Sequence, residues 1–245
     1  MSEQTIGTAK QQRMAAVTAA VGKTSMVTAK VWNPWDHVME TGVTTAELQA
    51  NAVRGLVPDI IHDSDTFASI KPVLRSHYGA EAGLDGPLTE ANFAEAKAAL
   101  RKKYVRAGCR QYKNLPSGNC TLFACCVIGM LADQPDLLGP GVKVELVNLV
   151  DRKGGEGHAY VMVNRAPGDV KVAKSHGPDC FFVDIWYARQ QRTVPGTNAV
   201  KDITPVDTSA NPFWDFDFSA FIDEPENVPA VRLSFMSDEL PKLLL

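Results

Sequence analysis

The sequence lacks several features that would place it in a specialised class of protein. No apolar run approaches the roughly 18 residues that a transmembrane helix requires, so no membrane span is expected. The N-terminus has no apolar block followed by small residues, so we expect no cleavable secretory signal. The chain has 25 Lys and Arg against 28 Asp and Glu, and this lack of basic excess argues against a nucleic-acid partner.

Paired cysteines and metal-binding motifs are lacking as well. Five cysteines in 245 residues are an odd count at low density, which argues against a disulfide scaffold and favours a reducing compartment. Neither C-x-x-C nor H-E-x-x-H occurs, and Cys109 and Cys180 lack the spacing of a zinc site, so no cofactor or metal is expected. Two histidine–carboxylate groups are weaker metal candidates, with a solvated loop as the simpler interpretation: His37 with Glu40, and His62 with Asp63 and Asp65.

The length suggests one large domain, or one domain with an appendage. Residues 1–30 contain no aromatic side chain and are expected to form a flexible N-terminal segment, at most a marginal helix. Residues 31–107 have a helical pattern and are predicted to pack on the core. Their clearest helix, TEANFAEAKAALRKKYV, should begin at Thr89 or Glu90, because acids come early and basic residues late.

The pattern changes at residue 108, and residues 108–245 are predicted to form the catalytic core. The apolar run TLFACCVIGMLAD predicts a helix that ends near Gln134. VKVELVNLV, HAYVMVN and CFFVDIWY then predict three antiparallel strands, so the fold class is α+β. The C-terminal region reads as loop-rich, with five prolines: Pro195, Pro205, Pro212, Pro225 and Pro229. Its segment 213–218 alternates aromatic and acidic residues, and either packs on the core or contacts a substrate or partner.

Cys120 stands where a loop, Ser117-Gly118-Asn119, turns into the apolar helix. The positive end of a helix dipole favours a thiolate, which is the nucleophilic form of cysteine. Cys125 and Cys126 lie inside the apolar run and are interpreted as core residues. An inert, buried Cys120 is the alternative to a reactive one.

His158 follows a glycine-rich stretch, Gly154-Gly155-Glu156-Gly157, at the start of a predicted strand. Strand alternation places His158 with Tyr160 and Met162 on one face, and we expect that face to border a cleft. A loop histidine without a chemical role is the alternative.

Asp184 lies within Phe181-Phe182-Val183-Asp184-Ile185-Trp186-Tyr187, where an unpaired carboxylate would be costly. Its best partner is an imidazole N–H on the neighbouring strand, the orienting role of an acid in a catalytic triad. The alternative is a structural ion pair with an arginine.

GNCTLFACCVIGMLAD, GHAYVMVN and CFFVDIWY together resemble the core of the papain-like and transglutaminase-like cysteine enzymes. In that superfamily a Cys heads the central helix, a His opens a strand, and an Asp follows on the next strand. The resemblance covers roughly residues 108–190 and implies a catalytic triad of Cys120, His158 and Asp184. The stretch between His158 and Asp184 is long for the family, so RAPGDVKVAKSHGPD reads as an inserted hairpin that contains His176.

The resemblance also implies an oxyanion hole formed by the Cys120 backbone N–H and a side-chain amide. Asn114, six residues upstream, is the best candidate, with Gln111 and Asn119 as alternatives. Three residues near the triad are predicted to contact substrate: Gly118, Tyr160 and Trp186.

We therefore predict a cysteine hydrolase that acts on protein carboxamide or peptide bonds through a thioester, either a glutamine deamidase or a cysteine protease. Bacterial effectors and toxins that modify host proteins share the core that this chain resembles. A cytoplasmic protein, or an effector secreted without a cleavable signal, would fit. The alternatives are a transglutaminase or acyltransferase, an inactive binding or scaffold protein on the same fold, and a metal-dependent enzyme.

Overall fold

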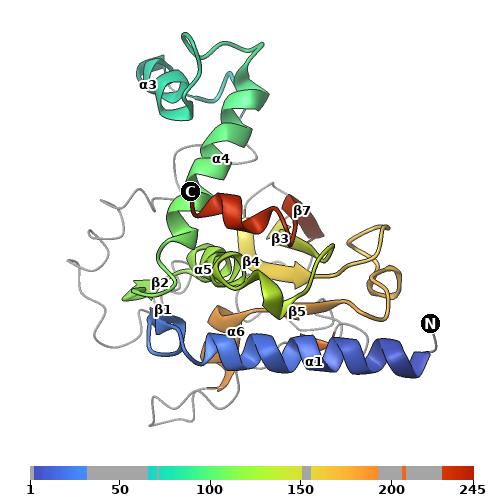
Figure 1. Cartoon of the computed structure of the whole chain (residues 1–245). Coiled ribbons are helices and arrows are strands. Elements are labelled where there is room, and N and C mark those ends of the chain that lie inside the picture. The colour runs from blue at the N-terminus through green and yellow to red at the C-terminus, as the bar shows by residue number, and fades with distance from the viewer. Residues whose placement is uncertain (1–2, 32–65, 71, 151–155, 193–205, 208–227) are drawn as a thin grey trace.

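A buried helix, α5 (Cys120–Asp133), forms the centre of the fold in the computed structural model of the chain (Figure 1). Its side chains from Leu122 to Ala132 are all buried, as expected of a helix that is apolar on every side. The predicted helix is therefore confirmed, with its end at Asp133, directly before Gln134. The structure describes residues 3–31, 66–70, 72–150, 156–192, 206–207 and 228–245.

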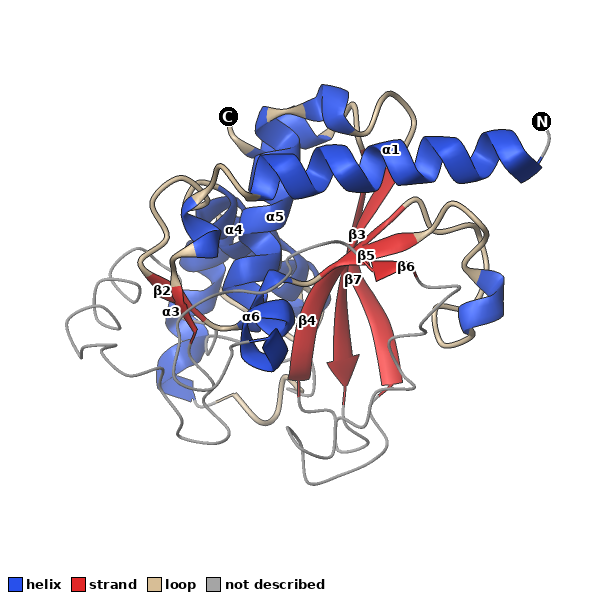
Figure 2. Ribbon diagram, turned by 90° about the horizontal axis from the view of Figure 1, so that it is seen from below, coloured by secondary structure: helices blue, strands red, loops and turns tan. Residues whose placement is uncertain are grey.

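An antiparallel sheet packs against α5, with the strand order β6-β5-β4-β3-β7 (Figure 2). Its strands are β3 (Lys143–Val150), β4 (Glu156–Val163), β5 (Phe181–Val183), β6 (Val206–Asp207) and β7 (Val228–Met236). The face toward α5 consists of buried apolar residues: Val144, Leu146, Ala159, Val161, Val163, Phe181 and Val183. The predicted α+β class and the antiparallel pairing of the three central strands are thus confirmed.

The last predicted strand, CFFVDIWY, is only partly a strand. β5 ends at Val183, and residues Ile185–Arg192 form a helix, α6. Asp184 lies between them, and its backbone carbonyl accepts from the Ala188 N–H at 3.0 Å. Asp184 is therefore not in mid-strand as predicted, but at a helix N-terminus.

The C-terminal region was expected to be loop-rich, and this is wrong for β7. This strand pairs along the length of β3, with Pro229 opposite Leu149. Proline cannot donate a hydrogen bond to a neighbouring strand, so it is tolerated in a strand at the end of a sheet. The other four prolines and the aromatic–acidic segment 213–218 lie outside the described residues. The chain ends in a 3₁₀ helix, η6 (Leu240–Leu243), that packs on α5.

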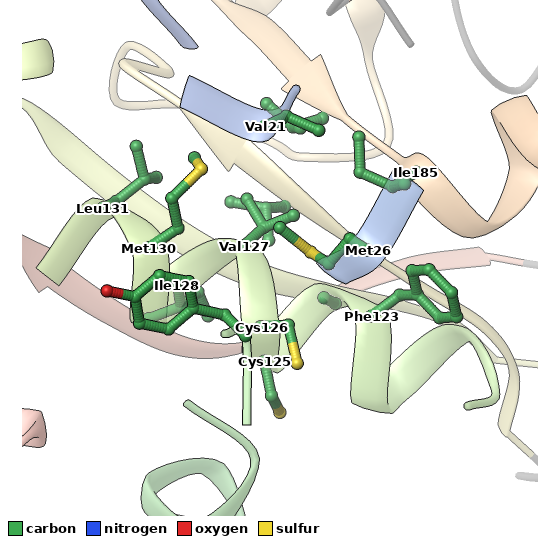
Figure 3. Close-up of a cluster of buried hydrophobic side chains, with 14 of the residues drawn as sticks. Val21, Met26, Phe123, Cys125, Cys126, Val127, Ile128, Met130, Leu131 and Ile185 are labelled. Atoms are coloured by element: carbon green, nitrogen blue, oxygen red, sulfur yellow. The ribbon is translucent and has the colours of Figure 1, made fainter. Parts of the chain in front are cut away.

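Residues 3–30 are held in the fold, where their composition predicted a flexible segment or at most a marginal helix. Residues Glu3–Val21 form a helix, α1, followed by the 3₁₀ helix η1 (Ser25–Val27) and a short strand, β1 (Lys30–Val31). The small and medium apolar side chains of this segment are buried in the main core: Met14, Val17, Ala20, Val21, Met26, Ala29 and Val31. Figure 3 shows Val21 and Met26 beside Val127 of α5 and Ile185 of α6.

Polar contacts across the chain hold α1 as well. The Lys10 ammonium donates to the Pro178 carbonyl at 3.0 Å, and the Arg13 Nε donates to the Leu138 carbonyl at 3.0 Å. Leu138 follows the short 3₁₀ helix η2 (Pro135–Leu137). Because both acceptors lie far away in the sequence, local composition could not reveal that this segment is held in place.

The predicted helical region contains α3 (Pro72–Ala82) and α4 (Phe93–Cys109). α4 begins later than predicted, because Thr89 and Asn92 close a turn before it: the Thr89 N–H donates to Asn92 Oδ1 at 2.7 Å, and the Asn92 N–H donates to Thr89 Oγ1 at 3.3 Å. The helix also runs through the expected boundary between residues 107 and 108.

Two glycines allow α4 to pack closely on α5. A Cβ at Gly129 would lie 2.0 Å from the Cys109 carbonyl oxygen, and one at Gly108 would lie 2.5 Å from the Cys125 Cβ. Any side chain at either position would force the two helices apart. The C-terminal part of α4 is therefore continuous with the core that surrounds Cys120.

Candidate active site

Cys120 is the first residue of α5, as predicted. The side-chain oxygen of Asn119 accepts from the Leu122 N–H at 3.0 Å, and the backbone carbonyl of Asn119 accepts from the Phe123 N–H at 3.1 Å. Since the first N–H groups of a helix have no acceptor within it, those of Cys120 and Thr121 are the donors at this helix end. The thiol of Cys120 therefore lies where the backbone favours negative charge.

The other four cysteines lie in a different environment. All five cysteines fall within the described residues and are free thiols, and Cys120 alone is partly exposed. Burial raises the pKa of the Cys125 and Cys126 thiols well above the usual value, and that of Cys109 to about 12. The interpretation of Cys125 and Cys126 as core residues is confirmed (Figure 3).

His158 and Asp184 form a buried pair. The His158 Nε2 lies 2.5 Å from Asp184 Oδ2, and the two side chains are only 3% and 4% exposed. Asp184 is thus paired with an imidazole on the neighbouring strand, as predicted. Because Nε2 faces the carboxylate, it carries the hydrogen of the neutral ring, and Nδ1 is left as the acceptor.

Helix α6 holds Asp184 in place. The Tyr187 N–H donates to Asp184 Oδ1 at 2.9 Å, so this carboxylate caps the helix with one oxygen and holds His158 with the other. The sequence carried this signal, since an aspartate before Ile185 can start a helix. The aromatic residues after it pointed instead to a strand.

The Cys120 thiol lies close enough to the His158 ring to influence the pKa of the imidazole. Burial lowers the pKa of His158, but the Asp184 carboxylate and the Cys120 thiol outweigh it and raise the pKa to about 10. An imidazole that stays protonated beside a thiol favours the thiolate–imidazolium pair. The three residues predicted from the sequence are therefore in contact.

Aromatic rings surround His158 where an open cleft was expected. The ring centroids of Trp186, Tyr160 and Tyr187 lie 5.1, 6.2 and 6.4 Å from that of the imidazole. The predicted face of β4 is correct, but Tyr160 and Met162 are fully buried on it. Tyr160 packs on Phe182, and Trp186 is only 5% exposed, so neither is placed as a substrate contact. Both rings instead shield the His158–Asp184 pair from water.

Gly118 has a packing role that the sequence did not suggest. It lies in the short strand β2 (Ser117–Gly118), parallel to β1, and a Cβ here would lie 3.1 Å from Leu122 Cδ2. Its lack of a side chain therefore lets the loop pack against the first turn of α5, and its predicted contact with substrate stays a prediction.

The oxyanion candidates lie on both sides of this strand. The side-chain oxygen of Asn119 is committed to capping α5. Asn114 is exposed and Gln111 is half-buried, both in the loop that precedes β2. This cap uses only the oxygen, so in the described contacts Asn119 keeps its side-chain NH₂ group for donation, as Asn114 and Gln111 do.

The segment predicted as an inserted hairpin folds without strands. Residues 164–180 contain the 3₁₀ helix η3 (Ala173–Ser175) and are held by Arg165, which pairs with Glu145 of β3 at 2.7 and 2.9 Å. The buried His176 donates from Nε2 to the Val170 carbonyl at 2.8 Å, within the same segment. His176 therefore has a structural contact there.

No cluster of three or more His, Cys, Asp or Glu side chains suited to a metal occurs in the part of the chain that the structure describes. The weaker metal candidates near His37 and His62 lie outside that part. No helix among the described residues has the length and apolar character needed to cross a bilayer.

Comparisons of this chain with protein-family models, with curated proteins and with solved structures found no match. Arguments about function therefore rest on the geometry around Cys120.

Proposed function

We propose that this chain is a cysteine-dependent hydrolase that acts on protein carboxamide or peptide bonds through a thioester. One observation carries the proposal: the one partly exposed thiol, Cys120, lies beside His158, whose Nε2 is held by the buried Asp184. A nucleophile, a base and an orienting acid in this order are the usual machinery of acyl transfer.

In this mechanism the proton of Cys120 rests on His158, and the thiolate attacks the carbonyl carbon of the substrate. The oxyanion that forms is stabilised by the N–H groups at the start of α5. The C–N bond then breaks, and the leaving ammonia or amine takes the proton from His158. A water molecule gives a proton back to His158 and attacks the thioester, which releases the acid and restores the thiolate.

Asp184 contributes by fixing the imidazole. Its Oδ2 keeps Nε2 protonated, so that Nδ1 addresses the thiol, and its charge stabilises the imidazolium between the two proton transfers. The surrounding rings keep water away from the pair, which strengthens this interaction.

A simple test uses p-nitrophenyl acetate, an activated ester that acylates a reactive thiol and releases nitrophenolate. We expect the wild type to release nitrophenolate and Cys120→Ala to lose the activity. Cys125→Ala, which removes a buried thiol from the same helix, is the matched control and should keep it. An unreactive wild type, or a Cys120→Ala variant with full turnover, would support an inactive scaffold instead.

The reaction class is resolved by intact-mass analysis of candidate protein substrates. Deamidation changes the mass by the difference between a carboxamide and a carboxylate, proteolysis yields fragments, and transglutamination adds the mass of an amine. A host protein as substrate, in the manner of the bacterial effectors that the sequence resembles, belongs to this proposal and is tested by the same analysis.

A further inference from the structure

The N-terminal segment 25–31 runs alongside the loop that leads into Cys120. β1 and β2 lie side by side near α5, with Lys30 paired to Ser117 and Val31 paired to Gly118 (Figure 1). The Lys30 N–H donates to the Pro116 carbonyl at 3.0 Å. The two segments in contact lie about 90 positions apart in the sequence, as Ser25 and Leu115 do.

One hydroxyl joins this segment to both ends of a turn in the loop. Ser25 Oγ donates to the Tyr112 carbonyl at 2.9 Å and accepts from the Leu115 N–H at 2.6 Å. The Ser25 N–H also donates to the Tyr112 carbonyl, at 3.3 Å. The turn that these bonds close contains Asn114, whose N–H donates to the Gln111 carbonyl at 2.9 Å.

The segment that carries Ser25 is itself firmly held. Met26 and Ala29 are buried in the main core, and Thr24 caps the N-terminus of η1 with a hydroxyl that accepts from the Met26 N–H. Tyr112 is likewise anchored, since its hydroxyl donates to Asp133 at the end of α5. Ser25 therefore links two fixed parts of the molecule across the turn.

We propose that Ser25 is a positioning residue for acyl transfer: its hydroxyl fixes the turn at residues 112–115, and through it the loop that carries the candidate oxyanion donors to Cys120. This inference rests on the proposed function. Of the candidate amides, Asn114 lies in this turn, Gln111 directly precedes it, and Asn119 follows on the loop that reaches Cys120 within five residues of Leu115.

Two reagents separate positioning of the oxyanion site from general damage. Acylation by p-nitrophenyl acetate passes through an oxyanion, whereas alkylation by iodoacetamide needs only the thiolate. We expect Ser25→Ala to lower the acylation rate constant by about 10- to 100-fold, somewhat less than removing an oxyanion donor outright. The alkylation rate of Cys120 should stay within about two-fold, because the His158 pair is untouched.

Thr24→Ala is the matched control. Thr24 is a neighbouring buried hydroxyl that bonds only within its own segment, to the Val21 carbonyl and the Met26 N–H. We expect Thr24→Ala to leave the rate constants of acylation and alkylation unchanged at temperatures below the melting temperature of the variant. Should Ser25→Ala fail to fold, Ser25→Cys replaces it, because a thiol keeps a weaker donor and acceptor with longer bonds. Ser25→Cys should also lose acylation selectively, by a smaller factor.

An equal loss of acylation and alkylation in the Ser25 variants, or no loss in either, would overturn the positioning role. Failure of the proposed function has a separate signature: Cys120→Ala would then release nitrophenolate as the wild type does. The adduct is assigned to Cys120 by peptide mapping in each variant, so the thiol of Ser25→Cys does not enter the comparison.

Discussion

Helix α5 holds three cysteines in two contrasting environments. Cys120, at the first position, is partly exposed and contacts His158. Cys125 and Cys126, less than two turns further along, are fully buried beside Gly108 of α4, and burial holds their pKa well above the usual value. The same residue type in the same helix is thus placed once for chemistry and twice for packing.

The contrast shows that surroundings, and not residue identity, decide the chemistry of a thiol. At the N-terminus, free N–H groups and an imidazole stabilise negative charge. In the interior, a thiolate would lose its hydration without such compensation, as the S–H of Cys126 has only the Gly108 carbonyl at 3.5 Å. Changes at the two places should therefore have opposite consequences for activity and stability.

The largest expected effect is that of Cys120→Ala on turnover. Because no other thiol in α5 can replace it, the rate of nitrophenolate release should fall at least about 1000-fold. The melting temperature should change little, since the side chain is partly exposed. Wild-type turnover in Cys120→Ala would contradict the assignment of Cys120 as the nucleophile and would leave no chemical difference between it and the interior thiols.

Asp184→Asn should lower turnover by roughly 10- to 1000-fold, less than in a serine triad, because a thiolate–imidazolium pair depends less on its third member. Asparagine can still cap α6, so the fold should persist. Turnover is measured well below the melting temperature, with circular dichroism to verify folding. Wild-type turnover in the folded variant would exclude an orienting role.

The His158–Asp184 pair should also give stability a distinct pH dependence. The folded pKa of His158 is raised to about 10 from an ordinary value of 6.5, so its stabilising contribution is complete below about pH 6.5 and is lost as the pH rises through about 10. The difference in melting temperature between the wild type and His158→Gln should therefore shrink over that window. A difference that is constant from pH 6.5 to 10 would contradict the raised pKa.

The smallest effect on turnover is expected for the interior thiols. Cys125→Ala and Cys126→Ala should keep full activity and lower the free energy of unfolding by about 1 kcal/mol each, through lost packing. Chemical denaturation and nitrophenolate release measure the two quantities in the same samples. Loss of activity in either variant, with an intact fold, would mean that the interior thiols take part in chemistry.

Local patterns in the sequence predicted much of the core. The continuous apolar run of α5 and the Val-rich strands β3 and β4 follow from residue type alone, and so do the positions of Cys120 and His158 at the starts of their elements. Burial of Cys125 and Cys126 followed from the same run. These features depend on neighbouring residues, which a sequence displays directly.

Features that depend on distant contacts were missed. α1 is poor in aromatic residues and gains its order from contacts such as Lys10 with Pro178, 168 positions away. Ile185, Trp186 and Tyr187 favour a strand locally, but Asp184 starts a helix there because its carboxylate caps α6. Likewise, the enclosure of Tyr160 arises from packing on both faces of β4, which alternation alone cannot reveal.

Alkylation of the native protein tests the central claim most directly. Iodoacetamide is added near neutral pH, and intact-mass analysis with peptide mapping follows the adducts over time, with His158→Gln as the comparison. We predict rapid addition of a single adduct, on Cys120, and a markedly slower reaction in His158→Gln, with the other four cysteines modified only after unfolding. A wild-type Cys120 that reacts no faster than in His158→Gln, or no faster than Cys125 and Cys126, would contradict an activated nucleophile at the head of α5.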